Sequence, residues 1–126
     1  MAVKFTVNER INPSNLQEPK KWYALAKSTG ETTLRTLGKE IAARSTVSPA
    51  DTQAVLVALT EVIVEHLADG KIVRLGDFGT FQVHVSSNGA ETEAKFHASL
   101  IKGNKVIFRP GIDLREMKNN LKYEKV

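Results

Sequence analysis

The sequence contains no cysteine, so it offers no disulfide bond, thiolate metal site or thiol nucleophile. It also lacks any apolar run near the roughly 18 residues that a membrane span requires. Its first residues do not show the basic, apolar and small-residue order of a secretory signal. These absences predict a cytoplasmic protein with no membrane partner.

The sequence shows no arrangement of catalytic or metal-binding residues. None of His66, His84 and His97 has a carboxylate or a second histidine at the usual ligand spacing. The "GDFG" at residues 76–79 resembles the magnesium-binding triplet of kinases, but a chain of 126 residues is far too short for that fold. We therefore expect no enzyme, no metal, no cofactor and no small-molecule substrate.

The charge is mildly basic and unevenly distributed. The chain carries 18 Lys plus Arg against 14 Asp plus Glu. Residues 100–126 hold seven basic and three acidic side chains, which accounts for the whole excess. This distribution is compatible with a polyanionic partner, although a solvated helix face is the plain alternative.

Residues 1–32 show the pattern of paired strands. Val3, Phe5 and Val7 alternate with polar residues, which is the period of a strand with one buried face. Turn-forming residues follow, and "KKWYALAKS" at 20–28 is a second β-prone run. We predict an N-terminal β-hairpin extension over residues 1–32.

A helical period begins at Thr33. Leu34, Leu37 and Ile41 fall on one face of an amphipathic helix that should end near Ser45. Gly38 inside this helix costs about 1 kcal/mol relative to alanine. It indicates either close packing or a weaker helix.

The next helix has a clear start signal. The Ser48 side chain can accept a hydrogen bond from the backbone of Asp51, and Pro49 suits the first helical position. The helix should end near Ala68, with Gly70 as a left-handed cap.

Only a narrow polar stripe interrupts the apolar surface of this second helix. Its apolar residues spread wider than one neighbouring layer could cover in so small a chain. The simplest interpretation places it between its own sheet and a second copy of the chain, and the alternative is a few partly exposed valines. The residues are Val55, Leu56, Val57, Leu59, Val62, Ile63, Val64 and Leu67.

The stretch "DGKIVRLGDFGTFQV" at 69–83 begins a predicted antiparallel sheet. "KIVRL" is a short strand, "GDFG" a turn, and "TFQVHV" at 80–85 a second strand. Two more strand candidates, "KFHASLI" at 95–101 and "NKVIF" at 104–108, are separated by the turn residues Lys102 and Gly103. After "RPG", helical spacing of Leu114, Met117 and Leu121 predicts a short basic amphipathic helix.

This order of elements, with "VRLGDFGTF" at 73–81 and "FRPG" at 108–111, resembles the HU and IHF family of bacterial histone-like DNA-binding proteins. The resemblance implies an α+β fold in residues 33–126, in which two chains intertwine as a homodimer. Their helices would form the base, and their antiparallel sheets a saddle for the minor groove of double-stranded DNA.

The resemblance also assigns residues. Arg74 matches a basic position beside the glycine turn formed by Gly76 and Gly79, and Arg109 matches the basic residue of the "F-basic-P-G" corner. Further DNA-binding candidates come from pattern alone, with exposed lysines as the plain alternative; they are Lys95, Lys102, Lys105 and Lys118. The expected dimer core comprises Leu56, Leu59, Ile63, Phe78, Phe81 and Phe108.

The chain departs from the family pattern in its arm and at its start. Family members extend a basic β-ribbon whose tip proline wedges between base pairs. Here "SSNGAETEAKFHAS" at 86–99 has no proline and only one basic residue other than histidine, Lys95. Ile112 stands where many relatives have lysine. The first 32 residues resemble those of the extended HU-like proteins of Bacteroides-type bacteria.

We expect a nucleoid-organising homodimer that binds duplex DNA with little sequence specificity, mainly through phosphates. The alternative is an HU-fold interaction module with reduced DNA binding, which holds a protein partner through the extension. The arm favours this alternative, because residues 86–99 carry Glu91 and Glu93 against the single Lys95.

Overall fold

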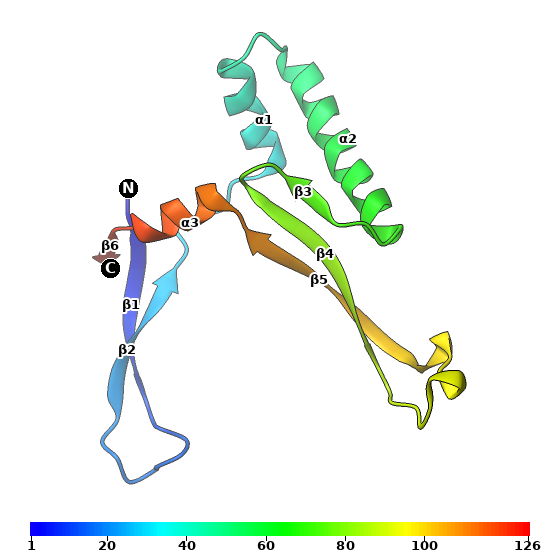
Figure 1. The fold of residues 1–126 in the computed structure, drawn as a ribbon. Helices are drawn as coiled ribbons and strands as arrows, with labels where there is room; N and C mark the ends of the chain where they lie inside the picture. Colours follow the sequence, from blue (N-terminus) through cyan, green and yellow to red (C-terminus); the bar gives the residue numbers. More distant parts are fainter. The chain divides into compact units, whose positions relative to one another are not determined.

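The computed structural model describes residues 1–126, which form an α+β protein of two compact units. One unit is residues 34–116, and the other combines residues 1–33 with 117–126. Figure 1 shows the order of the elements along the chain.

Two helices begin the first of these units. They are α1 (Leu34–Ala43) and α2 (Pro49–Ala68). The predicted start of α2 is confirmed, because the Ser48 hydroxyl accepts a hydrogen bond from the Asp51 N–H at 3.2 Å. Gly70 has the expected left-handed backbone, with φ of +81°.

Gly38 allows close packing between the two helices. It is buried, and a Cβ at this position would overlap the side-chain amide of Gln53. That amide donates a hydrogen bond to the Arg35 carbonyl at 2.9 Å. Close packing, and not merely a weak helix, therefore explains this glycine.

The same unit contains the predicted antiparallel sheet, in the order β3–β4–β5. Its strands are β3 (Val73–Leu75), β4 (Gly79–Ser87) and β5 (Ile101–Pro110). Since β3 pairs only with residues 79–81 of β4, the β4–β5 ribbon continues beyond Phe81 without a third strand (Figure 1).

The sequence prediction was wrong at the end of this ribbon. Residues 95–101 were expected to form a strand, but they contain parts of two 3-10 turns, Glu93–Lys95 and Ala98–Leu100. Local bonds stabilise these turns, since the Thr92 hydroxyl accepts from the Lys95 N–H at 3.3 Å. Lys102 and Gly103 lie within β5 and not in a turn, because β5 pairs with β4 as far as Ser87.

The second unit is built around another three-stranded sheet, in the order β2–β1–β6. β1 (Val3–Arg10) and β2 (Lys21–Lys27) are antiparallel, which confirms the predicted hairpin. β6 (Tyr123–Lys125), which the sequence did not predict, runs parallel to β1. The last helix, α3, covers Ile112–Asn119 and so excludes Leu121, because the following backbone pairs with β1: the Val3 N–H donates to the Lys122 carbonyl at 2.8 Å.

The chain has no buried hydrophobic side chain. A folded domain normally closes its apolar side chains into a dense interior. Here the apolar side chains of both sheets and of α2 remain half-buried or exposed. No helix has the length and apolar character needed to cross a membrane.

Candidate nucleic-acid interface

The two motifs that carry the family resemblance contact each other through their backbones. The Gly111 N–H donates a hydrogen bond to the Phe78 carbonyl at 2.8 Å, and the Asp113 N–H donates to the Asp77 carbonyl at 3.1 Å. A Cβ on Gly111 would overlap the Asp77 carbonyl group. The turn after β3 therefore fixes the corner that ends β5.

The glycines of this turn have different structural roles. Gly76 adopts a left-handed backbone with φ of +52° and has open space around it. Gly79 is buried, and a Cβ there would overlap the Phe108 ring and approach the Arg109 carbonyl to 2.8 Å. Gly79 thus allows β4 and β5 to pack closely beside Arg109.

Strand register places the two predicted arginines on one face of the sheet. Arg74 on β3 lies directly opposite Thr80 on β4, and Thr80 lies directly opposite Arg109 on β5. Directly opposed residues share a face, and neighbouring strands lie about 4.8 Å apart. The two arginines therefore flank Thr80 at a backbone separation of about 10 Å.

The same face continues along the ribbon. Gln82 lies opposite Ile107, and His84 lies opposite Lys105. We call the row from Arg74, Thr80 and Arg109 to His84 and Lys105 the basic face. The sequence alone does not connect His84 with Lys105, because only the strand register brings them together.

The basic face has no compensating negative charge in its own sheet. β3, β4 and β5 contain no aspartate or glutamate. No ion pair involves Arg74, Lys105 or Arg109. An exposed cationic surface of this kind suits an anionic ligand such as phosphate.

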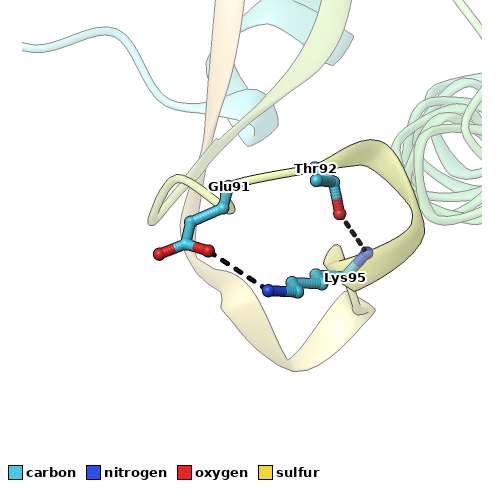
Figure 2. A network of polar contacts seen from close by, with 3 residues as sticks. All are labelled: Glu91, Thr92 and Lys95. Carbon is cyan, nitrogen blue, oxygen red and sulfur yellow. Dashed lines mark hydrogen bonds and ion pairs between the residues drawn. The ribbon is translucent and has the colours of Figure 1, made fainter.

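The other predicted DNA-binding lysines do not join this row. Lys102 lies beside the register irregularity between Ser86 and Ser87. It is three residues from Lys105, an odd spacing that puts two residues on opposite sides of a regular strand. Lys95 lies at the tip and pairs with Glu91 at 3.1 Å, as Figure 2 shows. Lys118 is in the last turn of α3, in the other compact unit.

The opposite face of the sheet is apolar. Phe81 lies directly opposite Phe108, with ring centroids 4.8 Å apart, and the Phe78 ring lies 5.7 Å from that of Phe108. Phe108 is nevertheless 36% exposed and Phe78 47% exposed. These predicted core aromatics form a cluster that the single chain leaves open.

The α2 helix is also incompletely covered. Leu56 and Ile63, two of the predicted dimer-core residues, are half-buried within the chain. Leu59 lies on another face with Val55 and Val62, and these three side chains are 42%, 63% and 46% exposed. Their spacing of four and three residues makes one continuous apolar stripe.

The structure contains no group of three or more histidine or acidic residues placed to hold a metal ion.

The comparisons with known proteins agree with the motif and fold. The family described as "HU domain fused to wHTH, Ig, or Glycine-rich motif" matches residues 1–125. The chain belongs to this family, HU-HIG.

A solved structure resembles the whole HU-HIG chain. It is the crystal structure of a presumed bacterial DNA-binding protein from Bacteroides vulgatus, with 14% sequence identity and a TM-score of 0.66. The match covers 99% of this chain but only 48% of that protein, so the chain spans about half the length of its relative. At this identity the likeness concerns the fold. No curated protein matches the chain.

Proposed function

We propose that this HU-HIG chain is a histone-like protein that binds duplex DNA as a homodimer with little sequence specificity. The basic face supplies the phosphate contacts. The β3–β4–β5 sheets of the two copies together form a saddle along the minor groove. In this proposal the protein helps to organise the nucleoid in the cytoplasm.

The observation that carries the proposal is the carboxylate-free row of cations on one side of β3–β4–β5. Arg74 and Arg109 flank a threonine, whose hydroxyl is another group that binds phosphate oxygens. Contacts to the phosphates of the DNA backbone give affinity without reading the base sequence. Membership of a family with an HU domain, and the description of the Bacteroides protein, support the same ligand.

The uncovered apolar surfaces support the proposed homodimer. The stripe of Val55, Leu59 and Val62 and the open phenylalanine cluster occur in a unit without a buried hydrophobic side chain. A second copy that covers them would supply the missing core, as in obligate dimers, whose interfaces resemble a domain interior. The helices would then form the base of the dimer.

The tip of the ribbon supports the alternative function. Its turns hold Glu91 and Glu93, and the only lysine pairs with Glu91. Such a tip gives neither a proline wedge nor a free lysine for DNA, which favours an interaction module that holds a protein partner. A titration with random duplex DNA separates the two functions.

The test is the salt dependence of binding to random duplex DNA, measured by fluorescence anisotropy. The double variant Arg74→Gln/Arg109→Gln should lower the slope of log affinity against log salt by about 1.8, because each phosphate contact contributes about 0.9. A matched control, Lys39→Gln/Lys71→Gln, removes two positive charges outside the basic face and should leave the slope nearly unchanged. Equal slopes for both variants would remove the arginines from the interface, and absence of wild-type binding would favour the interaction module.

A further inference from the structure

The N-terminal sheet has a cationic face of its own, which the register of β1 and β2 creates. Lys4 lies directly opposite Lys27, and Arg10 lies directly opposite Lys21. Because opposed residues share a face, all four basic side chains of these strands lie on the same side. We call this side the hairpin face.

Three of the four residues between the two pairs are also suited to phosphate, and the fourth is Leu25, opposite Thr6. From Lys4 to Arg10, the β1 residues on this face include Thr6 and Asn8, and Tyr23 of β2 lies opposite Asn8. Hydroxyl and amide side chains of these types commonly donate hydrogen bonds to phosphate oxygens. Tyr23 is 48% exposed, so its ring and hydroxyl are accessible.

The opposite side of the same sheet has a different chemistry. Val3, Phe5 and Val7 lie there on β1, with Ala24 and Ala26 on β2, and the Glu9–Trp22 pair lies on the same side. β1 and β2 place no basic residue on that side. The basic side chains of the hairpin are therefore confined to one side, as the period of two allows.

The opposed cations are unfavourable for the fold itself, because like charges directly across an antiparallel pair destabilise it. One pair has a partial counter-charge, since Lys4 forms an ion pair with Glu124 of β6 at 2.6 Å. Arg10, Lys21 and Lys27 form no ion pair. A bound polyanion would remove the repulsion that the fold leaves in place.

We propose that the hairpin face is a second phosphate-binding surface for DNA, separate from the basic face of β3–β4–β5. The two basic pairs lie six residues apart on β1, a distance of about 20 Å. That length corresponds to about six base-pair steps along the axis of the DNA helix. The inference rests on the proposed DNA-binding function and extends it to the N-terminal unit.

The test uses the full chain and random duplex DNA at several salt concentrations. Arg10→Gln/Lys21→Gln should lower the slope of log affinity against log salt by about 1.8 and weaken binding roughly 60-fold at 0.1 M salt. The control Lys71→Gln/Lys125→Gln removes the same charge from other positions: Lys71 already pairs with Asp69, and Lys125 lies opposite Phe5 on the apolar side.

Stability provides the second readout. Removal of one opposed pair should leave the thermal midpoint of the N-terminal sheet, followed by Trp22 fluorescence, equal to or above that of the wild type. Weaker DNA binding in a sheet that is no less stable supports the hairpin face. If wild type and the Arg74/Arg109 variant behave as proposed but Arg10→Gln/Lys21→Gln matches its control, this inference alone is overturned. If the wild type does not bind DNA, both proposals fail.

Discussion

The two sheets of this protein place their basic side chains in different ways. Each has three strands, a mainly apolar side and a cationic side, although the apolar side of β2–β1–β6 also carries Glu9 and Lys125. In β3–β4–β5 a neutral residue separates the cations, as Thr80 separates Arg74 from Arg109. In β2–β1–β6 cations oppose each other directly, and only Lys4 has an acidic partner.

This difference determines how much each sheet would gain in stability from binding a polyanion. Separated cations cost the fold little, so the basic face can be maintained without a ligand. Directly opposed cations are tolerated at a cost to the hairpin, which a polyanion would relieve. The two sheets also differ in construction, because β3, β4 and β5 follow one another in the chain whereas β6 joins β1 from the far end of the sequence.

The largest expected effect tests whether the apolar surface of α2 or that of the N-terminal sheet forms the dimer contact. Leu59→Glu would bury a carboxylate in each copy, so the free energy of dimer dissociation should fall by about 4 kcal/mol or more. Sedimentation velocity should then show loss of the dimer. Ala58→Glu, next to the acidic stripe of Glu61 and Glu65, is the control in α2.

The same measurement on the N-terminal sheet sharpens the comparison. Trp22 is 65% exposed on the apolar side of that sheet. Trp22→Gln should leave the dimer intact if α2 provides the contact. A dimer that survives Leu59→Glu but not Trp22→Gln would transfer the interface to the N-terminal unit and contradict the proposed dimer.

A substitution at Gly111 should destabilise the unit that contains β3–β4–β5 more than the other unit. Gly111→Ala forces a Cβ against the Asp77 carbonyl group, and neither backbone segment can move easily. We expect a loss of about 3 kcal/mol in the free energy of unfolding of residues 34–116, measured by circular dichroism in urea. Trp22, the only tryptophan, reports on the other unit and should change less.

The control for this substitution is Gly89→Ala. A Cβ at Gly89 meets no atom within 4 Å, and its backbone is not left-handed. Its unfolding curve should match that of the wild type within about 0.5 kcal/mol. Equal losses for Gly89→Ala and Gly111→Ala would refute the role of the contact between the turn and the corner.

The smallest expected effect concerns the counter-charge in the N-terminal sheet. Glu124→Gln leaves the Lys4–Lys27 pair without its acidic neighbour, so that sheet should lose about 0.5 kcal/mol of stability. Trp22 fluorescence in urea at low salt would measure the loss, which should shrink as salt screens the charges. Glu31→Gln, in the same unit and without an ion pair, should show no loss; an equal loss would exclude the specific pair.

Much of the fold was predictable because its signals are local. The cap at Ser48, the left-handed Gly70 and the alternation of β1 and β4 depend on residues close in sequence. The tip and the last strand were missed for opposite reasons. At the tip, the Thr92 side chain stabilises a 3-10 turn where the residue types favour a strand. β6 has only three residues and is formed by pairing with β1.

The candidate interface divides in the same way. Arg74 and Arg109 were identified from motifs, and the glycines from their turn. The roles of Thr80 and His84 in the row, and the opposed cations of the hairpin, were not, since these require knowledge of which residue faces which across strands.

The sequence by itself determined which side chains share a face within each strand, because the period of two is a property of the extended chain. It also determined where α2 begins and ends, through the Ser48 cap and the left-handed Gly70, which act over a few residues. Only the tertiary structure decided how those strands align, and therefore which cations stand beside a neutral residue and which oppose another cation. The physical reason is that register is set by hydrogen bonds and packing between segments distant in sequence, and one residue of slip would move every side chain to the other face.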